Sequence, residues 1–364
     1  MVPGGVDRSG THRVIPALLW LIERLARVHD LQIFALRQEP EPSRYRLLGA
    51  SVINIGRRAT MTRLGAALRT EHRHSAFAVL HVFWGGRHAA LVVSLARLLK
   101  LPVVLHLAGG ELARIPAIDF GGYRWFTSRL ALHLTARAAS AVTAPSALLV
   151  AVATARNIKV ERLPLGVDLE RWPLQAPRPR TDVGPARLIH VADLNRVKDQ
   201  ATLLRALEVL RHEGVAFRLD VAGTDTLGGR VQRFAQELGL EQLIRFHGFL
   251  PHRKLRQLVE RAHLHVLSSR YEAGGIAVLE AAAAGVPTVG TEVGHIAEFA
   301  PEGAVAVPVG DWRALGSALQ LVLADDELRL RLARRAQELV AREDADWTAR
   351  RVCELYEDLV GESR

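Results

Sequence analysis

The sequence predicts an α/β protein built from two doubly wound, Rossmann-like domains that face a cleft, the usual place for a ligand in such a protein. Three observations support this prediction. With 364 residues, the chain has the length of two ordinary domains. Short apolar runs alternate with longer segments of helical periodicity, as in parallel sheets wrapped by helices. The alternation is interrupted once, by a Pro- and Arg-rich stretch, and then restarts.

The first half of the chain predicts an N-terminal domain over residues 1–168. Two of its segments, 15–28 and 87–99, carry apolar residues at helical spacing. Its predicted strands are 31–36, 51–56, 78–83, 102–108 and 141–145. The alternation of these elements is that of a sheet covered by helices.

A glycine-rich turn at residues 3–10 leads toward the first helix without a full strand before it. Only Met1 and Val2 precede the turn, whereas an ordinary strand has ~5–6 residues. Loss of a central strand leaves its two neighbours with unpaired backbone groups. We therefore expect that the first strand is truncated in this chain and that the true start of the protein lies upstream.

Residues 169–186 are the predicted linker, because the prolines and arginines in this stretch favour neither helix nor strand. A second domain is predicted over 187–345, with helices at 198–214 and 230–238. Its predicted strands are 187–193, 217–223, 244–249, 263–269, 286–290 and 304–309. The last residues, 346–364, are expected to form a helix that packs back on the N-terminal domain.

Composition excludes several classes of protein. A chain with 49% apolar and 24% charged residues is expected to fold and to be soluble. One cysteine, Cys353, allows no disulfide and no cysteine-based zinc site, which suits the cytoplasm. The apolar runs are shorter than the ~20 residues that span a bilayer. No histidine has metal-ligand spacing with a matched partner, so no metal is expected.

The net charge of +10 raises the question of an anionic partner. Only four of the 48 basic residues are lysines, and the arginines are spread along the whole chain. No basic motif interleaved with aromatic residues accompanies them, so nucleic acid is not an expected partner. The simplest interpretation is biased arginine usage, and the functional alternative is peripheral contact with an anionic membrane.

The stretch RYEAGGIAVLEAAAAGVPTVG, 270–290, places two glutamates, Glu272 and Glu280, around the pair Gly274 and Gly275. It follows a predicted strand and begins a helix near Gly275–Ile276. Glycines at a helix start let the backbone approach a ligand, and the exposed N–H groups favour phosphate. Glu280 would then be placed to accept hydrogen bonds from a ribose diol. Spacing alone leaves an alternative open, a tight turn followed by a capping or paired carboxylate.

Two further strand ends are candidates for the same ligand. Lys198 is predicted at a helix N-terminus, where it would hold a diphosphate as a point charge with help from Arg196. The alternative is a solvated surface lysine. At the end of another strand, Gly248 and Phe249 would bring backbone atoms to a flat base, or they are an ordinary strand end.

These motifs together resemble those of the retaining glycosyltransferases of family four, which have the GT-B fold. Residues 268–299 resemble the family's signature of two glutamates, an Ala-rich helix and a glycine loop. Four other segments resemble further family motifs in the right order: the N-terminal glycine loop at 3–10, the HGxE loop at 106–111, the domain-crossing segment at 160–173 and the lysine-bearing strand–loop–helix at 187–207. The resemblance covers essentially the whole chain.

The resemblance implies retaining transfer of a sugar from a nucleotide-diphosphate sugar to a glycan, lipid-linked or small-molecule acceptor, with no cofactor and no metal. Glu272 and Lys198 would be catalytic, facing the donor sugar and the leaving diphosphate, and Glu280 would bind the ribose. The remaining implied donor contacts are the backbone of Gly274, Gly275, Ile276 and Ala277, together with Arg196, Gly248, Phe249, Gly4 and Gly5.

On the acceptor side the resemblance implies an N-terminal acceptor-binding domain, in which the loop His106, Gly109, Gly110 and Glu111 approaches the sugar. Two positions depart from the family pattern. Asp193 stands where the family has an arginine, and Ala108 replaces the histidine of HGxE, for which His106 is the candidate substitute. From the residues alone, a buried core histidine is the other interpretation of His106. Two other functions stay open, a nucleotide-sugar-binding protein with weakened catalysis and a nucleotide-sugar 2-epimerase of the same fold.

Overall fold

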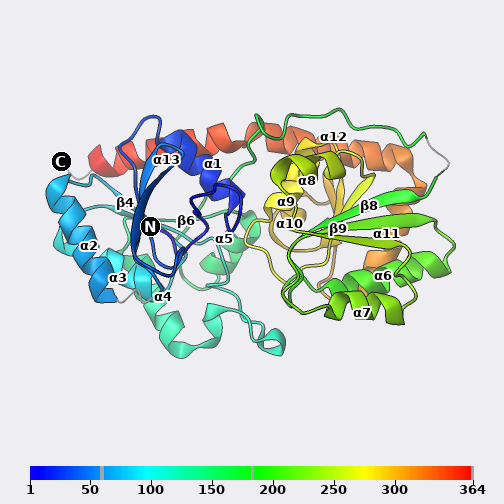
Figure 1. The fold of residues 1–364 in the computed structure, drawn as a ribbon, viewed down its shortest axis with the longest axis horizontal. Coiled ribbons are helices and arrows are strands. Elements are labelled where there is room, and N and C mark those ends of the chain that lie inside the picture. The colour runs from blue at the N-terminus through cyan, green and yellow to red at the C-terminus, as the bar shows by residue number, and fades with distance from the viewer. Residues whose placement is uncertain (58–60, 182–183, 362–364) are drawn as a thin grey trace. The chain divides into compact units, whose positions relative to one another are not determined.

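The computed structural model describes residues 1–57, 61–181 and 184–361. The chain divides into two compact units (Figure 1). Unit 1 is Met1–Gly166 together with the C-terminal residues from Ala345, and unit 2 is Val167–Asp344. Each unit has parallel strands covered by helices, so the predicted α/β class is confirmed.

Unit 2 contains one parallel sheet of six strands in the order β10-β9-β8-β11-β12-β13. The chain builds outward from β8 to β10 and then returns to the other side of β8 with β11, so the direction of winding reverses between β8 and β11. In sheets of this type a ligand binds at the carboxyl ends of the two strands where the order reverses. The strands are β8 (Ala186–Val191), β9 (Phe217–Ala222), β10 (Ile244–Gly248), β11 (Leu264–Leu267), β12 (Thr288–Thr291) and β13 (Ala304–Val307).

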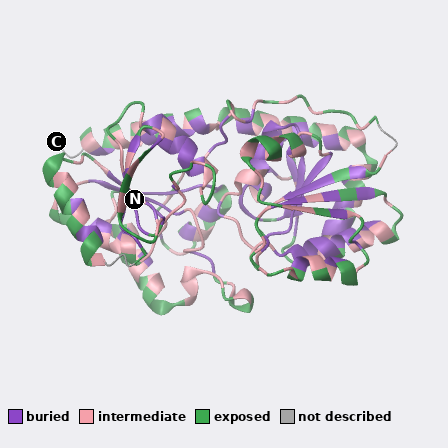
Figure 2. Cartoon of the chain, in the orientation of Figure 1, coloured by how far each residue is buried: buried purple, intermediate pink, exposed green. Residues whose placement is uncertain are grey.

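Helices bury both faces of this sheet, which explains why its central strands are apolar runs without alternation. Leu188, Leu264 and Val289 are fully buried, and α6 and α11 pack together over one side. Figure 2 shows these strands as the buried centre of the unit. The helices are α6 (Gln200–His212), α7 (Arg230–Glu237), α8 (His252–Val259), α9 (Ile276–Ala283), α10 (Gly294–Phe299), α11 (Trp312–Ala324) and α12 (Asp326–Arg342).

Unit 1 contains two separate sheets, of order β1-β3-β2 and β4-β5-β6-β7. Its strands are β1 (Gln32–Ala35), β2 (Ser43–Leu47), β3 (Ala50–Asn54), β4 (Leu80–Phe83), β5 (Val103–His106), β6 (Ala141–Ala144) and β7 (Glu161–Arg162). Its helices are α1 (Pro16–Leu25), α2 (Met61–His74), α3 (Arg87–Leu98), α4 (Phe126–Ala138), α5 (Ala147–Thr154) and α13 (Ala345–Gly361), with short 3-10 turns η1 (Pro116–Ile118) and η2 (Gly122–Arg124).

The strands that the sequence predicted are all present, and two unpredicted ones join them. β2 is antiparallel to β3 and lies at a sheet edge, with the sequence SRYRL. An edge strand has solvent on one side and tolerates charged residues, so it gives no apolar signal. β7 has only two residues, both polar, and pairs with β6 at another edge.

Met1 and Val2 lie between the two sheets of unit 1. Val2 pairs in parallel with Ala35, since its N–H donates to the Phe34 carbonyl at 3.0 Å and its carbonyl accepts from Leu36 N at 3.1 Å. On the other side, Phe83 N donates to the Met1 carbonyl at 3.0 Å. These two residues therefore occupy the end of a strand position between β1 and β4.

The C-terminal helix α13 packs along α1 within unit 1. Arg24 of α1 is buried and pairs with Asp346 at 2.7 Å. Thr348 of α13 contacts a second segment of unit 1. Its hydroxyl accepts a hydrogen bond from Gly166 N at 2.9 Å and donates one to the Pro164 carbonyl at 2.8 Å. Within the described ranges, no helix is long and apolar enough to cross a membrane.

Candidate functional site

The loops that follow β8 and β11 are joined by hydrogen bonds at the carboxyl end of the unit 2 sheet. Ser268 Oγ donates to the Lys198 carbonyl at 2.9 Å, and Arg270 N donates to the Val197 carbonyl at 2.7 Å. Neighbouring parallel strands end at the same edge of a sheet, so both loops meet at the point where the strand order reverses. Two segments some 70 residues apart in sequence thereby form one surface.

Lys198 and Glu272 form an ion pair in this surface. Lys198 Nζ lies 2.5 Å from Glu272 Oε1, and Ser269 Oγ donates to the same oxygen at 2.6 Å. Their side chains are 25% and 12% exposed, so both are only partly buried. Lys198 is therefore not a freely solvated lysine, and the structure brings the two predicted catalytic residues together.

Polar side chains that the sequence did not single out hold the Lys198 loop. Asn195 Oδ1 accepts hydrogen bonds from Val197 N at 3.0 Å and Lys198 N at 3.1 Å, a side-chain turn typical of asparagine. Asp199 has a left-handed backbone with φ +46°, and its buried carboxylate pairs with Arg270 at 3.0 Å. Asn195, five residues before the start of α6 at Gln200, was a readable turn signal. The Asp199–Arg270 pair had none, because its members lie in the loops that follow two different strands, β8 and β11.

A buried histidine lies beneath the same loop. His190 Nδ1 is 2.8 Å from the Val266 carbonyl, and its Nε2 is 3.2 Å from Gln200 Nε2. Burial lowers the pKa of His190 to about 4, so the ring is neutral at pH 7. In this tautomer Nδ1 donates to the carbonyl and Nε2 accepts from the Gln200 amide. The histidine thus ties β8, β11 and the start of α6 together.

The glycine turn before α9 is set by close packing. Gly275 has φ +100°, and the helix begins at Ile276 as predicted. Gly294 of α10 has φ +48°, and a Cβ there would lie 2.1 Å from the Gly274 carbonyl oxygen, so only glycine fits. His295 N donates to that same oxygen at 2.7 Å. The first N–H groups of an α-helix have no partner within the helix, so Ile276 and Ala277 offer theirs to an anion.

Glu280 lies on the second turn of α9 and is 4% exposed. Burial raises the pKa of its carboxyl to about 8, although the Trp172 side chain beside it opposes the shift. At pH 7 the Glu280 carboxyl is therefore mainly protonated, able both to donate and to accept a hydrogen bond.

The other predicted donor contacts lie on the same edge of the sheet at greater spacing. Arg196 is exposed in the loop after β8. Asp193 accepts a hydrogen bond from Thr224 N at 2.7 Å, so its carboxylate is directed to the end of β9. Gly248 ends β10 with φ +65°, and Phe249 after it is exposed. Because β10 is the outer strand, these two residues stand apart from the Lys198–Glu272 pair by the width of β9 and β8.

The residues of unit 1 that were predicted to lie near the donor or the acceptor make packing contacts and hydrogen bonds within that unit. His106 in β5 is fully buried, its Nδ1 lies 2.9 Å from Thr143 Oγ1, and burial lowers its pKa to about 3. A side chain without exposed surface does not contact a substrate, which favours a core histidine over a substitute for the HGxE histidine.

The loops after β4 and β5 are joined by Glu111, whose Oε1 accepts from Gly85 N and whose Oε2 accepts from Gly109 N, both at 2.8 Å. A Cβ on Gly110 would lie 2.7 Å from the Phe120 ring. Gly4 and Gly5 form the turn after Val2. Gly5 has φ +84°, and a Cβ there would lie 2.6 Å from Ile15 Cδ1, which explains the glycine by packing.

Comparison with known proteins shows which sequence family and which fold the chain resembles. Residues 175–339 match the family model of the glycosyl transferases group 1. A glycogen synthase of Mycobacterium tuberculosis is 36% identical over 184 residues, which is 50% of this chain and 44% of that protein. A D-inositol 3-phosphate glycosyltransferase of Corynebacterium urealyticum is 30% identical over 178 residues, 46% of this chain and 42% of the relative. The aligned part spans less than half the length of each of these curated relatives.

Solved structures resemble the chain over nearly its whole length. Sucrose-phosphate synthase from Thermosynechococcus elongatus has a TM-score of 0.77 at 19% identity, covering 94% of this chain and 92% of its own. HepE of Anabaena in complex with UDP has a TM-score of 0.74 at 16% identity, covering 98% and 99%. Residues 175–339 are therefore similar to the glycosyl transferases group 1, and the chain has the GT-B fold.

Proposed function

We propose that this protein is a retaining glycosyltransferase that moves a sugar from a nucleotide-diphosphate sugar to a hydroxyl of a glycan, lipid-linked or small-molecule acceptor. The observation that carries the proposal is the Lys198–Glu272 pair at the reversal point of the unit 2 sheet, beside the open N-terminus of α9. The names of the relatives support it, since they include glycogen synthase and a glycosyltransferase, and HepE was solved with UDP.

The donor diphosphate would bind to the N–H groups of Ile276 and Ala277 and to Lys198. The lysine ammonium has three donors, so it can contact a phosphate oxygen while it keeps its bond to Glu272. Helix N-termini and fixed cations are suited to phosphate oxygens. The remaining oxygen of Glu272 would accept a hydrogen bond from a hydroxyl of the donor sugar.

In the transfer step, the bond from the anomeric carbon to the diphosphate oxygen breaks, and a bond from that carbon to the acceptor oxygen forms on the same face. The acceptor proton passes to the leaving diphosphate, so the products are a glycoside and a nucleoside diphosphate. Negative charge gathers on the diphosphate as the bond breaks, and Lys198 and the α9 N-terminus lie where it develops. Charge stabilisation that is strongest in the transition state accelerates the reaction.

Glu280 would bind the ribose. Because its carboxyl is mainly protonated at pH 7, it can donate to one ribose hydroxyl and accept from the other. The Asp193 carboxylate accepts a hydrogen bond from Thr224 N and so would not lie beside the donor phosphates. Arg196 would supply a second positive charge near the donor. No metal is required in this scheme, and that expectation stays a prediction.

A screen of nucleotide sugars for release of nucleoside diphosphate tests the proposal directly. We expect release with at least one donor, stimulation by an acceptor, and a product whose anomeric configuration by NMR equals that of the donor. An inverted product would contradict retention while leaving transfer intact. Calorimetric binding of a nucleoside diphosphate without turnover of any donor would instead identify a nucleotide-sugar-binding protein.

A further inference from the structure

An exposed apolar stripe runs along helix α4 of unit 1. Phe126, Leu130 and Leu134 are four residues apart and therefore lie on one face of the helix, and Trp125 directly precedes them. All four residues are between 49% and 70% exposed. Figure 2 shows α4 mainly in the colours of intermediate and exposed residues. A contiguous apolar face of this kind is uncommon on a soluble protein and indicates contact with a partner.

The opposite face of α4 anchors the helix to unit 1. Leu132 and Thr135 are the buried residues of α4, and helical geometry places them on the side away from the stripe. Leu132 packs against Gly85, where a Cβ would lie 2.9 Å from Leu132 Cδ1. The helix also packs on α3 and on the turn η2. The stripe is therefore not used to hold α4 in place, and its side chains are available for another contact.

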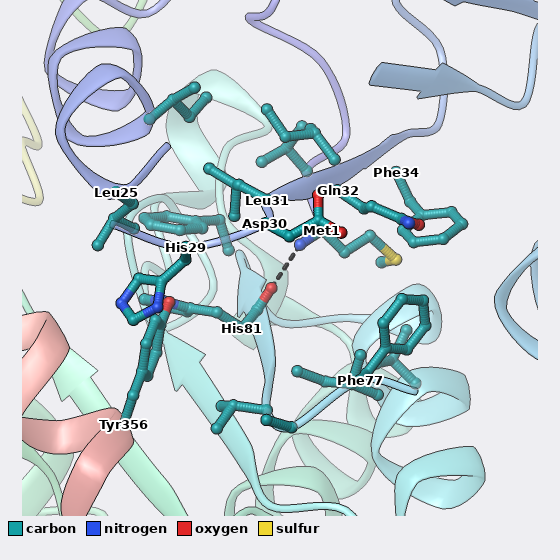
Figure 3. Close-up of a pocket in the computed structure, with 18 of the residues that line it drawn as sticks. Met1, Leu25, His29, Asp30, Leu31, Gln32, Phe34, Phe77, His81 and Tyr356 are labelled. Carbon is teal, nitrogen blue, oxygen red and sulfur yellow. Dashed lines mark hydrogen bonds between the residues drawn. The ribbon is translucent and has the colours of Figure 1, made fainter. Parts of the chain in front are cut away.

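Large apolar side chains elsewhere in unit 1 are covered by the chain itself. Figure 3 shows Leu25, Phe34 and Phe77 at a cavity of about 590 Å³ between β1 and β4. Leu25 and Phe34 are buried, and the rings of Phe34 and Phe77 meet edge to face with their centres 6.1 Å apart. Removal of apolar surface from water is favourable, so the stripe on α4 would gain stabilisation from a partner that covers it.

The segment that contains the stripe is basic. Residues 112–159 contain one acidic side chain, Asp119, which pairs with Arg124. Arg137 is exposed and follows Phe126 by about three helical turns, so it lies on the same side of α4 as the stripe. The face thus combines apolar side chains with a surplus of positive charge. The six basic residues of the segment are Arg114, Arg124, Arg129, Arg137, Arg156 and Lys159.

Arginines pack on the two aromatic rings that precede the stripe. The Arg124 guanidinium stands 5.5 Å from the centre of the Trp125 ring. Arg129 and Arg156 stand 5.7 Å and 3.9 Å from the centre of the Tyr123 ring. Tryptophan and tyrosine have an apolar body and a polar edge, which suits them to the boundary between hydrocarbon and water. The arginines add positive charge beside these rings.

These features discriminate between the kinds of partner that could cover the face. In a symmetric dimer the same patch would meet itself, so the surplus positive charges would repel each other across the interface. A nucleic acid would attract the arginines through its phosphates but would leave the aliphatic side chains of Leu130 and Leu134 without an apolar contact. An anionic bilayer supplies both contacts, phosphates for the arginines and acyl chains for the stripe.

We infer that the exposed face of α4 docks on an anionic membrane surface. Phe126, Leu130 and Leu134 would enter the boundary between the headgroups and the acyl chains, and Arg137 would contact lipid phosphates. The contact needs no rearrangement of unit 1, because the buried face of α4 keeps its packing. The inference is independent of the transferase activity proposed for unit 2.

Co-sedimentation of the full chain with vesicles tests the inference. Vesicles of phosphatidylcholine alone are compared with vesicles of phosphatidylcholine and phosphatidylserine in equal parts. We expect binding to the mixed vesicles only, and weaker binding as salt is raised, because salt screens the attraction between exposed charges. Failure to bind the mixed vesicles, or equal binding to both kinds, would overturn the inference.

A double variant, Phe126→Ser with Leu130→Ser, tests the apolar contact. It should bind the mixed vesicles roughly tenfold more weakly, because binding strength scales with the apolar area that is buried. Its Tm should stay close to that of the parent, since both positions are exposed. The matched control is Val309→Ser with Leu321→Ser, two exposed apolar residues of unit 2, and it should bind like the parent. Equal binding of the α4 double variant and the parent would contradict docking through this face.

The variant Arg137→Gln tests the charge contact. Loss of one arginine near an anionic surface should weaken binding to the mixed vesicles roughly fivefold and reduce its dependence on salt. Arg253→Gln, at an exposed arginine of α8 in unit 2, is the control and should leave both quantities unchanged. Unchanged binding and salt dependence in Arg137→Gln would contradict a contact between this face and lipid phosphates.

Fluorescence of Trp125 reports whether the face enters the lipid. The emission of an exposed tryptophan moves to shorter wavelength when its ring passes into apolar surroundings. We expect this shift when the parent meets the mixed vesicles, and its loss in Trp125→Phe. The same spectrum change in both proteins would overturn insertion of the face. A dimer in solution that Phe126→Ser with Leu130→Ser converts to a monomer would also overturn the inference, because the face would then be a protein interface.

Discussion

The two units use the same layered design, yet only unit 2 has a continuous sheet. Its six strands follow one another without a break, and the loops at the reversal point are fastened by Ser268, Arg270 and Asn195. In unit 1 the sheet is divided, and the backbone of Met1 and Val2 forms hydrogen bonds to both halves. Unsatisfied polar atoms at Gln32 and His81 accompany the break. A rigid sheet holds charged groups precisely, which supports the proposal that the donor binds to unit 2.

The largest effect is expected from Lys198→Ala, which removes the positive charge from the reversal point. Donor turnover should fall roughly 10²–10³-fold with little change in Tm, because the charge acts mainly in the transition state. Lys254→Ala, at an exposed lysine on α8 of the same unit, is the control and should keep normal turnover. Steady-state kinetics checks both, and near-normal turnover in Lys198→Ala would show that the pair is not the reacting centre.

Gly294→Ala should damage unit 2 through packing. The new Cβ would lie 2.1 Å from the Gly274 oxygen in a left-handed backbone, which displaces the turn before α9. We expect a loss of about 3 kcal/mol in the free energy of unfolding and weaker nucleotide binding. Gly65→Ala in α2 of unit 1 meets no atom within 4 Å and should stabilise by ~0.5–1 kcal/mol. Urea unfolding measures both, and equal stability of the two variants would contradict the packing account.

Glu280→Gln should change how stability depends on pH. In the folded protein the pKa of Glu280 is about 8, whereas its ordinary value, expected in the unfolded chain, is 4.5. As the pH rises from 4.5 to 8, the carboxyl of the unfolded chain ionises first. The folded state therefore loses stability relative to the unfolded state across this range. Glutamine does not ionise, so the variant should become more stable than the parent across this window, by a few kcal/mol at roughly pH 8.

Thermal unfolding between pH 5 and 8 measures this difference. The exposed Glu237→Gln on α7 should show no such divergence. If the stability difference between Glu280→Gln and the parent is flat with pH, the carboxyl is not held protonated by burial.

The smallest effect is expected from Glu111→Gln in unit 1. One of the two carboxylate oxygens that accept from Gly85 and Gly109 becomes an amide NH₂, so one hydrogen bond is lost. We expect a cost of ~1–2 kcal/mol in stability. Calorimetry should find nucleoside diphosphate binding unchanged, because unit 2 is intact. A large loss of that binding would contradict the assignment of the nucleotide site to residues of unit 2.

Much of this site was readable from the sequence because its parts are local. Lys198 and Glu280 each follow a recognisable strand and turn, and the helix start at Ile276 was predicted from the glycine pair. Arg270, Asp199 and His190 were missed, since the partner of each lies some 70 residues away in the sequence. His106 is fully buried, which favours the core histidine that the sequence left open as an alternative, and sequence position near a strand end does not reveal such burial.

By itself, the sequence determined the α/β alternation, the glycine turns and the position of Lys198 and Glu272 after predicted strands, because these follow from local periodicity and backbone sterics. Tertiary structure alone decided that β11 returns beside β8, which sets Glu272 against Lys198 across 74 residues of chain. It also decided that Glu280 is buried and protonated, and that a cavity lies between β1 and β4. These outcomes depend on strand order and on packing between distant segments, and neither is encoded in any short stretch.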